Sequence, residues 1–178
     1  MQVFFDDRQF GHAPEFYFRL GVNIPHPEQS GRARLLREIM IEVGHDIITP
    51  GNYGLDPIYT VHDPDYVDFL RTACDRWVEG TGYTHPAIPN YHKGRRISRV
   101  PNGFIGKLGY YATDTSCPVM RGTWDAIYWS DQCAVDGARG RRRGSSVRSL
   151  SSSGAPCIPG RVEWLLLLQH RCRGRAGT

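Results

Sequence analysis

The chain has 178 residues, of which 22 are Lys or Arg and 18 are Asp or Glu, so its formal net charge is +4. This length predicts one domain or part of a larger one, and 40% hydrophobic residues exclude a wholly disordered chain. Leu165–Leu168, the longest aliphatic run, is too short to span a membrane.

Two features predict a cytoplasmic protein. The N-terminus, Met1–Phe5 followed by two aspartates, lacks the basic region and the long apolar stretch of a signal peptide. The five cysteines are odd in number and form no Cys-x-x-Cys pair. This pattern is typical of free thiols in a reducing compartment and not of a disulfide framework or a zinc finger.

Charge divides the chain into two parts. Residues 139–178 hold nine arginines and one acidic residue, which leaves 13 basic and 17 acidic residues in residues 1–138. We therefore predict an α/β portion over residues 1–139 and an irregular Arg/Ser/Gly-rich tail over residues 140–178. A basic tail is typical of nucleic-acid binding, and an incidental, disordered segment is the alternative.

The first part of the chain predicts two short strands, with a long loop and a helix between them. Met1–Phe5 predicts a short buried strand, and Gly11–Gln29, rich in His, Pro, Gly and aromatic residues, predicts a long loop. Ser30 is predicted to cap a helix that Gly44 ends. Its apolar positions at helical spacing are Leu36, Ile39, Met40 and Val43. Ile47–Thr49 predicts a second short strand.

A second helix is predicted to start at Pro64, with Asp63 as its cap, and to end near Gly80. The residues on its apolar face are Tyr66, Phe69, Leu70, Ala73 and Trp77. Tyr83–Asn102 predicts another long loop, and Thr123 is predicted to cap a last helix. This order predicts an α/β fold with a parallel sheet flanked by helices, incomplete because so few elements cannot cover both faces of a sheet.

Several short segments, in order, resemble one family. Pro25–Glu28 with Arg32, then Tyr53–Leu55 and Val61–Leu70, resemble the start of zinc-dependent deacetylases of the histone deacetylase superfamily. Three more segments narrow the resemblance to the acetylpolyamine amidohydrolase branch: Cys74–Trp77, Gly109–Tyr111 and Gly122–Ala126. Together they cover roughly residues 1–139.

The resemblance implies the arginase–deacetylase fold, of which this chain would hold only the front part of the sheet. In that family the site lies at the carboxyl ends of the parallel strands. Zinc activates a water, a His-His pair takes its proton, Asp-x-His and a further Asp hold the metal, and a Tyr polarises the acetyl carbonyl. The implied reaction hydrolyses an N-acetylated amine, of the acetylpolyamine or acetyl-lysine type, to the amine and acetate.

Those residues are not in the written sequence, which has neither adjacent histidines nor Asp-x-His. His62–Asp63 comes nearest, but a loop contact explains the histidine and a helix cap explains the aspartate. The histidines without the spacing of zinc ligands are His12, His26, His45, His85 and His92. We therefore predict no catalytic and no metal-ligating residue here, and expect a truncated, inactive form that binds no zinc.

The tail begins where the family has a strand and an Arg-Pro-Pro-Gly-His-His-Ala motif. One set of synonymous codons for Val147–Pro159, read one nucleotide later, spells Tyr-Ala-Leu-Ser-Arg-Pro-Pro-Gly-His-His-Ala-Tyr. In the same frame Gln169–Ala176 becomes Asn-Thr-Ala-Ala-Val-Ala-Glu-Gln, which resembles the family's next segment. We predict a frameshift, by an inserted or deleted base or a sequencing error, between about Ala138 and Val147.

Two positions carry over by resemblance. Arg32 stands where the family keeps an arginine near a channel behind the metal, although a surface pair in the first turn of a helix explains it equally. Ile105 stands where acetylpolyamine amidohydrolases carry an acidic residue that recognises the cationic substrate. Because isoleucine cannot attract a polyamine by charge, the intact parent is predicted to prefer a less cationic substrate. Phe16–Phe18 lie in a loop near the site and the dimer contact of relatives, where we favour ordinary packing.

Two other function classes stay open. One is a nucleic-acid-binding protein acting through residues 139–178, which an out-of-frame tail disfavours. The other is a non-catalytic module that docks on an intact deacetylase. For the parent we predict a small acetylated amine as substrate, a homodimer and no membrane partner.

Overall fold

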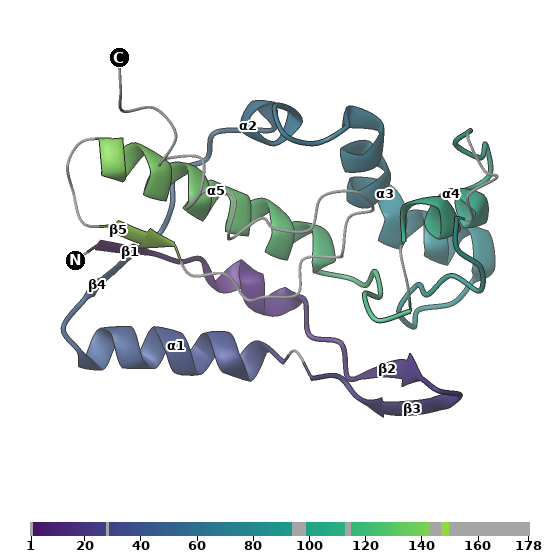
Figure 1. The fold of residues 1–178 in the computed structure, drawn as a ribbon, viewed down its shortest axis with the longest axis horizontal. Coiled ribbons are helices and arrows are strands. Elements are labelled where there is room, and N and C mark those ends of the chain that lie inside the picture. The colour runs from purple at the N-terminus through teal and green to yellow at the C-terminus, as the bar shows by residue number, and fades with distance from the viewer. Residues whose placement is uncertain (1, 28, 94–98, 113–114, 143–146, 150–178) are drawn as a thin grey trace, which may run out of the picture.

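The computed structural model describes residues 2–27, 29–93, 99–112, 115–142 and 147–149. A three-stranded parallel sheet has the order β4-β1-β5, formed by Asp46–Ile48, Gln2–Phe4 and Val147–Ser149. Figure 1 shows this sheet between α1 (Ser30–Glu42) and α5 (Thr123–Arg142). The predicted parallel sheet with flanking helices is confirmed, as are its first two strands.

The central strand owes its place to its apolar residues. Val3 is 0% exposed and Phe5, just past the strand, is also buried. Val3 pairs with Ile47 of β4 on one side and with position 148 of β5 on the other. Burial on both faces is usual for a parallel strand covered by helices, so a short apolar run suffices to specify it.

The predicted loop Gly11–Gln29 is wrong, because it contains a hairpin. β2 (Phe16–Arg19) and β3 (Val22–Pro25) pair antiparallel, with Tyr17 opposite Ile24. A two-residue turn joins them, in which Leu20 and Gly21 have φ values of 50° and 86°. Such turns usually carry Asn-Gly, so Leu-Gly gave little sign of one. A short 3-10 helix, η1 (Asp7–Gly11), links β1 to this region.

Helix α1 starts one residue off the prediction. Ser30 is its first residue, Gln29 is the cap and makes no capping side-chain hydrogen bond, and Gly44 with φ 81° follows its end as predicted. The first turn is therefore held by backbone hydrogen bonds alone. The side chains of Leu35 and Val43 remain largely exposed.

The predicted second helix is confirmed as α3 (Pro64–Thr81), and the Oδ1 of its cap Asp63 accepts the N–H of Asp65 at 2.8 Å. Its predicted apolar face forms the main core cluster. Phe69 there lies against Tyr111, with ring centroids 4.9 Å apart. Tyr111 belongs to α4 (Phe104–Tyr111), which the sequence analysis did not predict, as it did not predict α2 (Asp56–Tyr59).

The predicted last helix is α5, which continues to Arg142. Thr123 is its first residue and not its cap, and its Oγ1 accepts the N–H of Met120 at 2.9 Å. None of the helices in the described ranges is both long and apolar enough to cross a membrane. Residues 150–178, and with them most of the predicted tail and the shifted histidine motif, lie outside the described residues.

Candidate functional site

The carboxyl edge of the sheet is the candidate site, because open α/β sheets bind ligands where their parallel strands end. Two described segments leave the sheet there: η1 after β1, and residues 49–55 after β4. The segment after β5 lies outside the described residues. The structure therefore describes the segments that follow two of the three strands, and both segments are bound by α5.

After β1, an aspartate and an arginine form a closed pair. The buried Asp6 carboxylate accepts hydrogen bonds from the backbone N–H, Nε and Nη2 of Arg8 at 2.9, 2.8 and 2.7 Å. The Arg8 guanidinium, which makes two of these bonds, lowers the pKa of Asp6. The same guanidinium lies 3.2 Å from the ring centroid of Trp129 on α5. The pair thus fastens η1 to α5.

A histidine makes the next link between these two elements. His12 Nδ1 lies 2.9 Å from Oγ1 of the buried Thr123. That oxygen also accepts the Met120 N–H at 2.9 Å, so the Thr123 hydroxyl joins His12 to the segment that leads into α5. Burial, with a smaller effect of nearby His26, lowers the pKa of His12 to about 4. Sequence reasoning left these histidines scattered, whereas the fold brings His12 and His26 close enough to interact.

After β4, side chains of α5 bind the loop directly. Gln132, which is buried, accepts the N–H of Tyr53 at 2.7 Å and donates to the Gly54 carbonyl at 3.3 Å. Asp136 accepts the N–H of Gly51 at 2.7 Å and the Tyr53 hydroxyl. The hydrogen bond to Asp136 raises the pKa of the Tyr53 phenol.

Arg139 completes this contact, with its guanidinium carbon 3.9 Å from the Tyr53 ring centroid. Residues from successive turns of α5 therefore hold the loop that follows β4. Sequence analysis quoted Tyr53 only for its resemblance. It missed Gln132 and Asp136, which no local pattern marks because their partners lie about 80 residues away.

The two positions carried over by resemblance lie elsewhere. Arg32 is in the first turn of α1 with an exposed side chain, and Ile105 is in the first turn of α4, 41% exposed. Of the early aromatic residues, Tyr17 packs edge-on against His26 with centroids 5.3 Å apart, while Phe16 and Phe18 are exposed. Whether Arg32 and Ile105 border a channel remains a prediction.

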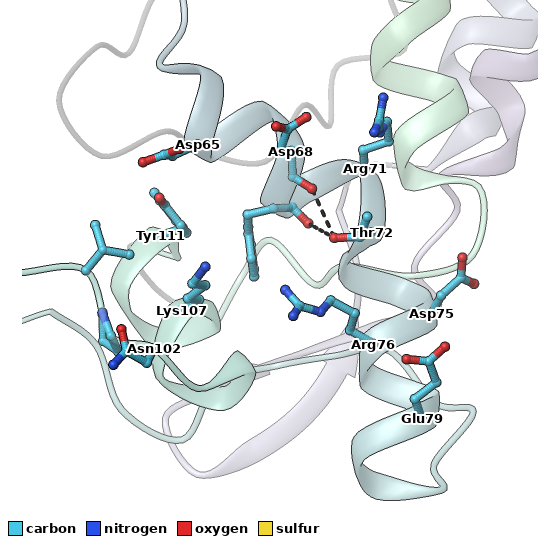
Figure 2. Close-up of a pocket in the computed structure, with 13 residues that line it drawn as sticks. Asp65, Asp68, Arg71, Thr72, Asp75, Arg76, Glu79, Asn102, Lys107 and Tyr111 are labelled. Atoms are coloured by element: carbon cyan, nitrogen blue, oxygen red, sulfur yellow. Dashed lines mark hydrogen bonds between the residues drawn. The ribbon is translucent and has the colours of Figure 1, made fainter.

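A separate groove of about 700 Å³ runs along α3 and α4 (Figure 2). Its charged residues on α3 are Asp65, Asp68, Arg71, Asp75, Arg76 and Glu79, and all of them are exposed. Burial and nearby Asp65 raise the pKa of Tyr111 to about 12, so this phenol stays protonated at neutral pH. The groove is a solvated helix face with mixed charge and no arrangement that would activate a nucleophile.

The described residues do not fit the zinc ion that the resemblance implies. Within the ranges that the structure describes, no three His, Cys, Asp or Glu side chains are placed to hold a metal ion. The two nearest candidates at the carboxyl edge are engaged, because Asp6 binds Arg8 and His12 Nδ1 binds Thr123. The described side chains at this edge are therefore bound to one another.

Comparison with known proteins points to one kind of enzyme. No protein-family profile matches the chain. It is 34% identical over 138 residues to acetylpolyamine amidohydrolase from Mycoplana ramosa, covering 76% of this chain and 40% of that protein. It is 37% identical over 103 residues to acetylpolyamine amidohydrolase 1 from Pseudomonas aeruginosa, covering 56% and 30%.

A solved structure gives the same result for the fold. The crystal structure of acetylpolyamine aminohydrolase from Burkholderia pseudomallei superposes with a TM-score of 0.74 at 30% identity, covering 82% of this chain and 42% of that one. The chain thus spans well under half the length of the relatives it matches. Both predictions, the resemblance and the fold, are confirmed: in sequence and in structure, the N-terminal part of this chain matches acetylpolyamine amidohydrolases and has their arginase–deacetylase fold.

Proposed function

We propose that this chain derives from a zinc-dependent deacetylase that hydrolyses N-acetylated amines to the amine and acetate. The observation that carries the proposal is the likeness to the Burkholderia pseudomallei enzyme, at a TM-score of 0.74 over 82% of the chain. The sequence identities of 34% and 37% to two curated acetylpolyamine amidohydrolases support it.

In that reaction, the described residues would position the carboxyl ends of the strands. The Asp6–Arg8 pair and the Gln132 and Asp136 contacts hold two strand ends against α5. When bound, zinc would activate the water and polarise the acetyl group. Since the written sequence has no His-His pair and no Asp-x-His, we propose that this form is inactive and binds no zinc, with the missing motif out of frame.

The surface around Ile105 supports a less cationic substrate than a polyamine. Ile105 has no charge, and the same helix carries Lys107. Lys93 adds a second cation, because its Nζ lies 3.0 Å from the Tyr110 hydroxyl and 4.1 Å from the ring centroid. Neither Ile105 nor these lysines offers a polycation the carboxylate that the resemblance places at this position. A homodimeric parent and a cytoplasmic location remain predictions from the sequence.

The experiment compares two proteins: the chain as written, and the polypeptide continued in the frame one nucleotide later through the end of that frame. Each is purified, its zinc content is measured, and it is incubated with an acetylated diamine and with an acetyl-lysine peptide. We expect hydrolysis and one zinc per chain only in the shifted-frame protein. A shifted-frame protein that folds and binds zinc but hydrolyses neither substrate would contradict the proposed activity, and stoichiometric zinc in the written chain would contradict its proposed inactivity.

A further inference from the structure

The outer face of α1 carries exposed apolar side chains. Its inner face is turned to the body of the molecule, because Ala33 is buried and the Arg37 Nε lies 3.6 Å from an Asp7 carboxylate oxygen on η1. Figure 1 shows this helix along one side of the sheet. Leu35 and Ile39, on the other side of the helix, are 57% and 39% exposed. Two large apolar side chains one helical turn apart therefore face solvent.

A charged residue stands at each end of this apolar pair. Arg32 precedes Leu35 by three residues, and Glu42 follows Ile39 by three. Spacings of three, four and three residues place all four side chains along one line of the helix, as in the seam between two paired helices. Arg32 and Glu42 are exposed, and within the described ranges neither forms an ion pair. We call these four residues the α1 seam.

The α1 seam is complementary to itself in one orientation. The midpoint between Leu35 and Ile39 is also the midpoint between Arg32 and Glu42. When a second copy lies antiparallel across that midpoint, Leu35 of each copy faces Ile39 of the other. Arg32 then faces Glu42 at both ends. A parallel pair would instead set Arg32 against Arg32 and Glu42 against Glu42, which repel, so charge complementarity selects the antiparallel pair.

We propose that α1 is a self-association surface, through which two copies of this chain pair antiparallel about a twofold axis. Leu35 and Ile39 form its apolar centre, and an Arg32–Glu42 ion pair closes each end. A single pair of helices buries less than the roughly 1,200 Å² of a standard stable interface, so the dimer is weak and depends on concentration. Glu38 lies beside the seam near its midpoint in both copies, and this repeated charge weakens the dimer further. The proposal concerns the chain as written and does not depend on the proposed activity.

Charge reversal at the ends of the α1 seam tests the orientation. Arg32→Glu sets two carboxylates together at each end, and Glu42→Arg sets two guanidinium groups together there. We expect each change to raise the dimer Kd about tenfold, measured by sedimentation velocity over a wide range of concentrations. The double variant Arg32→Glu/Glu42→Arg restores opposite charges and should return Kd to the parent value. Each single change also puts a favourable charge at its helix end, so loss of the helix does not account for a weaker dimer.

The matched control is Arg76→Glu, which makes the same change of charge at an exposed position on α3. It should leave Kd within about twofold, because it lies outside the α1 seam. A double variant that associates as weakly as the single variants would overturn the antiparallel pairing. A parent chain that stays monomeric at every concentration would overturn the association itself.

A chemical cross-link gives a second test that needs only a small fraction of dimer. Arg32→Lys keeps the positive charge and supplies an amine, which a carbodiimide joins to the Glu42 carboxylate as an amide while the reagent takes up the water and leaves as a urea. Positions 32 and 42 lie about 15 Å apart along one helix, too far for a direct bond, so this link joins two copies. Mass spectrometry should find the link, and adding Glu42→Gln should abolish it. Dimers that carry no such link would overturn the proposal.

Discussion

Helices α5 and α1 lie on opposite sides of the same short sheet, and they differ in how they are held (Figure 1). Helix α5 buries Thr123, Gln132 and Cys133, and polar contacts fix both strand ends to it. Helix α1 buries only Ala33 among its side chains and leaves Leu35 and Ile41 57% and 48% exposed. The α5 side is specified by buried polar partners. The α1 side has the ion pair of Arg37 with the exposed Asp7 and the Arg34 guanidinium over the Phe10 ring.

The largest expected effect is at the junction of η1 and α5. Gly122 has φ 90°, and a Cβ there would lie 2.6 Å from the Gly11 carbonyl oxygen. Gly122→Ala must therefore move backbone, and we expect a loss of about 3 kcal/mol or more in the free energy of unfolding, measured by urea denaturation.

The control for Gly122→Ala is a glycine in α1, on the opposite side of the sheet. Gly31, in the first turn of α1, has open space at its Cβ, so Gly31→Ala is expected to stabilise by about 0.5 kcal/mol. If both variants lose stability equally, the contrast between the two sides is wrong.

The second effect tests the polar anchor itself. Gln132→Ala removes the acceptor of the Tyr53 N–H and the donor to Gly54, and leaves these loop groups without that partner. We expect a loss of about 2 kcal/mol in the free energy of unfolding. Leu35→Ala on α1 removes an exposed side chain and should change it by less than about 0.5 kcal/mol. A larger loss for Leu35→Ala would show that α1 is covered in solution.

The third effect depends on pH. The pKa of His12 is about 4 in the folded chain against 6.5 ordinarily, so between these values the unfolded chain binds more protons. Stability should therefore fall as pH drops from 6.5 to 4, by about 2–3 kcal/mol through this residue. His12→Gln should flatten the profile measured by urea denaturation at several pH values.

Two other groups titrate in the same range. The pKa of His62 is also about 4, and burial raises the pKa of Asp131 to about 7, which acts in the opposite sense. The test is therefore the difference between His12→Gln and the whole chain. Leu35→Ala removes no titratable group, so it is the control and should keep the parent slope. An unchanged slope in His12→Gln would refute the role assigned to the buried ring.

The smallest effect on stability is expected on the outer face of α1. Leu35 and Ile39, one helical turn apart, are exposed. Ile39→Glu should leave the free energy of unfolding within about 0.5 kcal/mol but reduce self-association, seen by sedimentation velocity, because it interrupts an exposed apolar stripe. Unchanged association would mean that this face does not drive contact between molecules.

Local signals predicted the parts of the fold that depend on neighbouring residues. Asp63 before Pro64 gave the start of α3, and its apolar spacing gave the core face, because both are set within a few turns. The hairpin was missed since Leu20–Gly21 is an unusual turn and the aromatic residues around it stand among Pro and Gly. Ser30 and Thr123 were each one residue from the cap, a usual uncertainty at helix ends.

The candidate site could not be predicted in the same way. His12 and Thr123 are 111 residues apart, and Tyr53 and Gln132 are 79 apart. Nothing in either neighbourhood indicates the other, so only the folded chain brings them together. The family resemblance gave the fold and the reaction class, but not these contacts.

The distance in sequence between η1 and α5 also affects folding during translation. Gln9 donates to the Cys133 sulfur across 124 residues at 3.6 Å, so the first strand leaves the ribosome long before the helix that covers it. Until α5 has emerged, the early segment has no native partner on that side and depends on protection from aggregation. The β1–β4 pair can therefore form early, whereas α5 and then β5 join it only after the chain has been translated to Arg142 and Ser149.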